Sequence, residues 1–108
     1  IMYMKTKAQQ IDLKKMKSSA DAACRLMKVL NHRDRLMLLC EISQKEKCVG
    51  ELEEILDIHQ PMLSQHLTSL RRAKLVKTRR EGKNIFYSLG SDSALAVIQV
   101  LYQQFCKK

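Results

Sequence analysis

The sequence predicts one mainly α-helical domain with a single β-hairpin near its carboxyl end. The chain has 108 residues, a length typical of one compact domain, and its 45% hydrophobic content is enough to form a core. Only three glycines and one proline are present, which argues against a turn-rich, all-β fold. Apolar residues recur at steps of three and four over long stretches, as they do in amphipathic helices.

Two helices are predicted in the first part of the chain. The first covers about residues 11–30, and Asn31 and His32 interrupt it. A shorter helix follows over about residues 33–43, with Cys40 on its apolar face because it lies four residues after Leu36. The apolar stripe of the first helix consists of Leu13, Met16, Ala20, Ala23, Met27 and Leu30.

A pair of helices joined by a tight turn is predicted next. A short helix covers about residues 49–56, and residues 57–59 form the turn. Another helix runs from Pro61 to about Ala73, since proline is favoured at the first helical position. Its spacing predicts that Leu63, Leu67 and Leu70 are buried, and that the opposite face is polar and free of acids.

A hairpin and a last helix complete the predicted order. Residues 76–80 and 84–89 are expected to form two strands, joined by residues 81–83, which include a glycine. The last helix begins near Ser91 and Asp92, both good capping residues. Its apolar positions are Leu95, Ile98, Tyr102 and Phe105. The order α-α-α-α-β-β-α, with a hairpin directly after a two-helix motif, is that of a winged helix-turn-helix.

The formal net charge of +9 is distributed unevenly. Residues 41–57 are acidic on balance, whereas residues 71–83 carry seven basic side chains and one acid, Glu81. Such a run indicates an anionic partner, nucleic acid first. A membrane surface would instead require a basic helix with a bulky apolar face, and this run crosses a predicted strand.

These features predict that the chain binds double-stranded DNA. The second helix of the motif enters the major groove, and the basic residues contact phosphates. His66 is expected at the edge of this interface. The alternative for the polar face of the helix is that it is merely solvated and contacts no DNA. The predicted base-reading residues are Gln60, Ser64, Gln65, Thr68 and Ser69, and the predicted phosphate contacts are Arg71, Arg72, Lys77, Arg79, Arg80 and Lys83.

Other classes of protein are disfavoured. No run of about 18 apolar residues exists, so no membrane span is predicted. No apolar stretch resembling a signal peptide occurs in residues 1–12, so we expect a cytoplasmic protein. The three histidines form no catalytic or metalloprotease motif, and no glycine-rich phosphate loop is present. We therefore expect neither an enzyme nor a bound cofactor.

The four cysteines, Cys24, Cys40, Cys48 and Cys106, are packing thiols, reactive thiols or both. A reducing cytosol disfavours structural disulfides. A zinc ribbon is excluded because the sequence contains no C-x-x-C pair. Cys24 is predicted to pack, and Cys48 to be a partly exposed bystander. Cys106 lies near the chain end, followed by Lys107 and Lys108, which favour its thiolate, while a terminal carboxylate opposes this effect.

Several segments together resemble the ArsR family of bacterial repressors, from about residue 13 onward. The recognition helix and the hairpin carry the most specific part of this resemblance. In addition, the positions of Cys40 after Leu39 and of Cys106 after Phe105 resemble the thiol-based branch that includes BigR, SqrR and HlyU. The matching segments read VGEL at 49–52, QPMLSQHL at 60–67, LRR at 70–72, LV at 75–76 and IFYSL at 85–89.

The resemblance implies a homodimeric repressor that binds an inverted-repeat operator. It further implies that a small sulfane-sulfur compound or another oxidant bridges Cys40 and Cys106, which lowers DNA affinity. A direct disulfide needs Cα atoms within about 7 Å, and inserted sulfur atoms relax that limit. The first and last helices are expected to pair across the dimer. The resemblance leaves open which cysteine reacts first.

Two other functions stay open. Metal sensors of the family carry C-V-C on the third helix, whereas this chain has Cys48, Val49 and Gly50. Another metal site uses Asp and His on the last helix, where this chain offers Asp92 and no histidine. A single cysteine is a poor ligand set for a thiophilic ion, so no metal site is predicted. A metal-responsive repressor and a constitutive DNA-binding regulator with packing cysteines are the alternatives.

Overall fold

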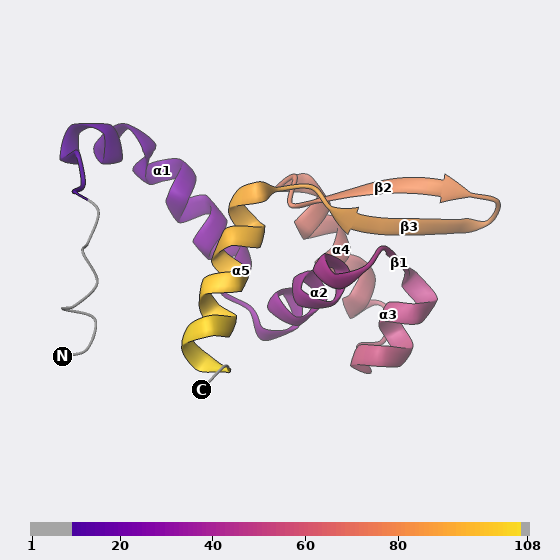
Figure 1. Ribbon diagram of the computed structural model, residues 1–108. Coiled ribbons are helices and arrows are strands. Elements are labelled where there is room, and N and C mark those ends of the chain that lie inside the picture. The colour runs from indigo at the N-terminus through magenta and orange to yellow at the C-terminus, as the bar shows by residue number, and fades with distance from the viewer. Residues whose placement is uncertain (1–9, 107–108) are drawn as a thin grey trace.

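The helices and the hairpin follow one another in the predicted order, and one short strand, β1, is added between α2 and α3 (Figure 1). The structure is a computed structural model, and it describes residues 10–106. The hairpin projects to one side, and α1 extends away from the opposite side. The elements are α1 (Leu13–Leu30), α2 (Arg33–Gln44), β1 (Lys47–Cys48), α3 (Val49–Leu56), α4 (Met62–Arg72), β2 (Val76–Glu81), β3 (Asn84–Leu89) and α5 (Asp92–Phe105).

Capping residues set the helix boundaries. The Asp12 carboxylate accepts hydrogen bonds from the backbone N–H groups of Lys14 and Lys15, at 3.0 and 3.3 Å, so α1 begins at Leu13 rather than at residue 11. Ser91 caps α5 as predicted. Pro61, predicted as the first helical residue, instead lies just before α4.

The core forms where α2, α3, α4, α5 and β2 meet. Leu63, Leu67 and Leu70 are buried, which confirms the predicted inner face of α4. Burial of that face fixes the rotation of α4 and turns its polar face outward. The other fully buried large side chains are Leu38, Leu39 and Leu52.

The hairpin belongs to a three-stranded sheet in the order β1-β3-β2. Strand β2 runs one residue further than predicted, because Glu81 pairs with Asn84 and leaves a two-residue turn. Gly82 begins that turn with a φ of +64°, a conformation that favours glycine. Strand β1 was not predicted, because its two residues, which pair with Tyr87 and Phe86, are too few to show an alternating pattern.

The apolar stripe of α1 is largely exposed within the chain. Leu30 is buried, but Leu13 and Met27 are 77% and 58% exposed. Cys24 is exposed too, so the prediction that it packs in the core is wrong. On α5, Tyr102 and Phe105 are also exposed. Helix α1 reaches beyond the core, and its apolar residues therefore find few neighbours in their own chain (Figure 1).

No helix within residues 10–106 combines the length and the apolarity needed to cross a lipid bilayer.

Candidate nucleic-acid interface and thiol pair

The outward face of α4 carries most of the predicted base-reading residues. Ser64, Gln65 and Thr68 are exposed, whereas Ser69 is half-buried. Gln60, just before the helix, is exposed, and its Oε1 accepts hydrogen bonds from both the backbone N–H (3.1 Å) and the hydroxyl of Ser64. Gln60 thus supplies the cap that Pro61 lacks and orients Ser64 at the start of α4.

His66 lies on the buried side of α4 rather than on its exposed side. The side chain is only 4% exposed, so the prediction that it is interfacial is wrong. Arg35 Nε donates to His66 Nδ1 (3.4 Å), and the His66 ring lies 4.3 Å from the His32 ring. Burial lowers the pKa of His66, and the nearby His32 and Arg35 lower it further. A neutral His66 therefore anchors α4 against the beginning of α2.

Exposed basic side chains follow α4 and continue along the hairpin. Within the part of the chain that the structure describes, none of them has a carboxylate partner within 4.0 Å, apart from Arg79. They are therefore available to an external anion. The predicted phosphate contacts among them that remain free of such a partner within residues 10–106 are Arg71, Arg72, Lys77, Arg80 and Lys83, all of them exposed.

Arg79 is engaged inside the chain. Its Nε and Nη2 atoms each lie 2.8 Å from the Glu46 carboxylate, and Nη1 lies 3.3 Å from Glu81. The guanidinium also lies 4.7 Å from the centre of the Phe86 ring. These hydrogen bonds hold the pKa of Glu46 below its usual range. Arg79, predicted to contact phosphate, here ties the hairpin to the segment before β1.

The structure packs α2, which carries Cys40, against α5, whose C-cap is Cys106. Cys40 is half-buried on α2, and Cys106 is exposed at the end of α5. Cys40 lines a pocket together with Tyr102, Gln103 and Gln104, which lie in the last turn of α5. Burial raises the pKa of the Cys40 thiol, and the charges of Cys106 and Glu41 raise it further. Lys107 and Lys108, predicted to favour the Cys106 thiolate, lie outside the described residues.

Comparison with known proteins identifies the family of this chain. A profile of bacterial regulatory proteins of the arsR family matches residues 32–78. The biofilm growth-associated repressor of Agrobacterium fabrum is 50% identical over 97 residues, which span 90% of this chain and 83% of that repressor. The chain belongs to the ArsR family.

Solved structures place this ArsR-family protein in the BigR/HlyU-like branch. The repressor BigR from Xylella fastidiosa has a TM-score of 0.86 and 41% identity, over 91% of this chain and all of that one. Reduced HlyU from Vibrio cholerae has a TM-score of 0.81 and 39% identity, over 86% of this chain and 98% of that one. The predicted winged helix-turn-helix fold is confirmed, and the protein is a DNA-binding transcription regulator.

One further group of possible metal ligands lies in this ArsR-family chain. Donor atoms of His32, Asp34 and His66 lie within 4.8 Å of one another, and His66 Nε2 is buried without a hydrogen-bond partner among residues 10–106. However, the Asp34 backbone N–H donates to His32 Nδ1 (3.1 Å), as Arg35 Nε does to His66 Nδ1. Both neutral rings therefore carry their proton on Nε2. A metal ion bound to Nε2 would replace this proton and leave the ring proton on Nδ1, which could then no longer accept either hydrogen bond. We therefore assign no metal ion to this cluster.

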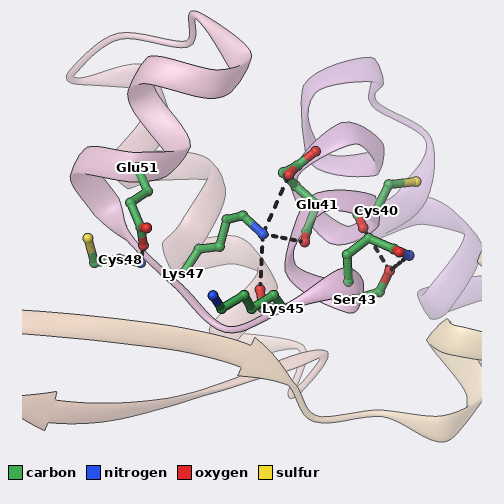
Figure 2. Close-up of polar contacts among 8 residues, drawn as sticks. Cys40, Glu41, Ser43, Lys45, Lys47, Cys48 and Glu51 are labelled. Atoms are coloured by element: carbon green, nitrogen blue, oxygen red, sulfur yellow. Dashed lines mark hydrogen bonds and ion pairs between the residues drawn. The ribbon is translucent and has the colours of Figure 1, made fainter.

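Cys48 caps a helix. It precedes α3, where its backbone N–H donates to the Glu51 carboxylate at 3.0 Å (Figure 2). Hydrogen bonds from Cys48 hold the pKa of Glu51 below its usual range. Figure 2 shows Lys47 lying between Cys48 and Cys40. Cys48 is half-buried, as predicted, and its contacts are those of a capping residue.

Proposed function

We propose that this regulator is a homodimeric repressor whose operator affinity falls when Cys40 and Cys106 become bridged. The effector is a sulfane-sulfur compound or another thiol oxidant. The observation that carries the proposal is that the half-buried Cys40 shares a pocket with the last turn of α5, directly before the exposed Cys106. The similarity to BigR and HlyU, which spans nearly the whole chain, supports it.

The exposed polar groups of α4 read base edges, and the basic groups beside them hold phosphates. Amide and hydroxyl side chains pair with base edges in the major groove, whereas Arg and Lys neutralise the backbone. The base-reading residues in this proposal are Gln60, Ser64, Gln65, Thr68 and Ser69, and the phosphate contacts are Arg71, Arg72, Lys77, Arg80 and Lys83. Arg79 contributes to this surface by holding the hairpin in place.

The exposed apolar residues of α1 and α5 form the dimer interface in this proposal. They are large, and their own chain leaves them uncovered. A solved winged helix-turn-helix domain from Mycobacterium bovis, with 25% identity and a TM-score of 0.70, is described as homodimeric. A bridge at the end of α5 then alters the spacing of two recognition helices, which must fit half-sites about one turn apart.

The proposed chemistry is stoichiometric thiol exchange, without turnover. The Cys106 thiolate attacks the terminal sulfur of a persulfide RS–SH, so a Cys106 persulfide forms and RS⁻ leaves. The Cys40 thiolate then attacks Sγ of Cys106, which forms the disulfide and expels HS⁻. If Cys40 is also persulfidated, the Cys106 persulfide attacks Sγ of Cys40 and expels HS⁻, which leaves one inserted sulfur. Exposure favours Cys106 as the first nucleophile, and the raised pKa of Cys40 lowers its thiolate fraction, which disfavours Cys40 in that role.

Operator binding measured on one protein sample in two states tests this proposal. Fluorescence anisotropy with operator DNA should give a dissociation constant that rises after a glutathione persulfide donor and recovers with dithiothreitol. Zinc added to the reduced protein should leave the constant unchanged. A constant that responds to zinc and not to the persulfide would replace this proposal with a metal-responsive repressor, and no response to either would favour a constitutive regulator.

Replacing Gln65 with alanine should reduce sequence discrimination. The bidentate amide of glutamine pairs with adenine, and such a pair contributes about 1–3 kcal/mol against the wrong base. We expect weaker operator binding with little change on random DNA, measured as the ratio of the two dissociation constants. Glu54→Gln on α3 is the control, because Glu54 is exposed and lies outside the proposed contacts. An unchanged ratio in Gln65→Ala would contradict the assignment.

Replacing Arg80 with glutamine should weaken binding to every DNA sequence. Arg80 is exposed on β2, and loss of one phosphate contact lowers the salt slope of log K by about one. Titrations at several salt concentrations measure this slope. Lys17→Gln on α1 removes the same charge outside the proposed phosphate contacts and should leave the slope unchanged. Equal slopes for Arg80→Gln and the wild type would remove Arg80 from the phosphate contacts.

Replacing Glu41 with glutamine should accelerate bridging near neutral pH. The Glu41 carboxylate raises the pKa of Cys40, so its loss lowers that pKa and increases the thiolate fraction. The midpoint of the pH–rate profile for bridge formation should move to lower pH, as measured by quenched mass spectrometry. The Glu54→Gln protein should keep the wild-type profile. A shift to higher pH in Glu41→Gln would show that the carboxylate does not oppose the Cys40 thiolate.

A further inference from the structure

Lys47 joins the end of α2 to the hairpin sheet. Its Nζ lies 3.3 Å from the Glu41 carbonyl oxygen, 3.5 Å from the Glu41 carboxylate and 3.4 Å from the Lys45 carbonyl oxygen (Figure 2). The side chain is only 12% exposed, so these contacts are shielded from water. Glu41 directly follows Cys40, whose own carbonyl oxygen accepts a 2.7 Å hydrogen bond from the Ser43 hydroxyl.

The contact depends on the last turn of α2. The Glu41 carbonyl is among the last four of the helix, which lack partners inside it. No basic residue occupies that turn, so Lys47 supplies the positive charge that a helix carboxyl end favours. A change in the position of this turn therefore alters the hydrogen bonds of Lys47.

The backbone of the same residue belongs to the hairpin sheet. In β1, Lys47 pairs with Tyr87 and Cys48 pairs with Phe86 of β3. The preceding residue, Glu46, holds Arg79 of β2 through two 2.8 Å contacts. Segment 46–48 is thus fixed to both long strands, and Lys47 cannot follow a moving α2 without moving the sheet or breaking its contacts.

We infer that Lys47 is a positioning residue that transmits the state of Cys40 to the DNA-binding hairpin. This inference rests on the proposed function, because it requires a bridge between Cys40 on α2 and Cys106 on α5. Formation of that bridge displaces the last turn of α2 toward α5, and Lys47 carries the displacement into β1. The hairpin then changes its angle relative to α4, and its phosphate contacts no longer fit the operator together with the recognition helix.

A comparison of Lys47→Met with Lys45→Met tests this role. Both variants lose one positive charge, but the exposed Lys45 side chain makes none of these contacts. For each protein, the operator dissociation constant is measured when fully reduced and when fully bridged, as verified by intact mass. The bridged-to-reduced ratio should fall by roughly 2- to 30-fold in Lys47→Met, relative to wild type, and stay unchanged in Lys45→Met.

The ratio separates coupling from a merely structural role. A structural defect weakens binding in both states and leaves the ratio at its wild-type value, which would overturn the inference. If Lys47→Met does not fold by circular dichroism, Glu41→Gln removes the ion pair alone and must lower the ratio in its place. A wild-type protein whose affinity does not respond to bridging would instead refute the proposed function, so the two failures are distinguishable.

Discussion

Cys40→Ser protein is expected to bind the operator as tightly as wild type and to keep that affinity after persulfide treatment. Serine matches the size of a half-buried thiol but cannot form a sulfur bridge. Without Cys40 the reaction stops at the Cys106 persulfide, and the recognition helices keep their reduced spacing. Anisotropy titrations before and after treatment measure this loss of response, which should be complete.

The other cysteines provide matched controls. Cys106→Ser should also lose the response, whereas Cys24→Ser and Cys48→Ser should retain it. Cys24 is exposed on α1, and Cys48 caps α3. If Cys40→Ser protein still released operator DNA on treatment, the two-thiol switch would be wrong.

Phe105→Glu protein is expected to be monomeric and to bind operator poorly. Phe105 is 74% exposed on α5, so the change costs little inside one chain but places a charge in the proposed dimer interface. Loss of the second half-site removes avidity that is typically worth about 10²- to 10⁴-fold. Sedimentation velocity measures the assembly state, and anisotropy measures the loss of affinity.

A second replacement of an exposed apolar residue by glutamate, at Ile55, tests whether the loss of the dimer is specific to the proposed interface. Ile55 is 50% exposed on α3, a helix that lies away from α1 and α5 (Figure 1). Ile55→Glu protein should therefore sediment as wild type does. A Phe105→Glu protein that remained dimeric would place the interface elsewhere.

Sequence periodicity was sufficient to predict α4 because this helix buries one stripe of side chains. The Leu63, Leu67 and Leu70 spacing predicted both α4 and its outward polar face, and the structure confirms it. The same rule located α1, whose stripe is uncovered in its own chain, because periodicity shows that a face is apolar but not what covers it. Strand β1 escaped detection because two residues carry no period.

The polar groups were harder to predict because their roles depend on contacts distant in sequence. His66 lies at the border of the apolar face, and only the position of α2 decides that it is buried. Arg79 belongs to a uniform basic run, and nothing local indicates that Glu46, 33 residues earlier, engages it. The pairing of Cys40 with Cys106 came from the family resemblance, because no spacing rule connects positions 66 residues apart.

Peptide mapping after persulfide treatment tests the proposed link between Cys40 and Cys106. Intact mass spectrometry of wild-type protein counts the sulfur atoms gained, and non-reducing digestion identifies the linked peptides. The two-thiol switch predicts that the peptides containing Cys40 and Cys106 are joined, directly or through added sulfur, in the sample that has lost operator affinity. Loss of affinity with persulfides on unlinked cysteines, or with a link through Cys24 or Cys48, would contradict it.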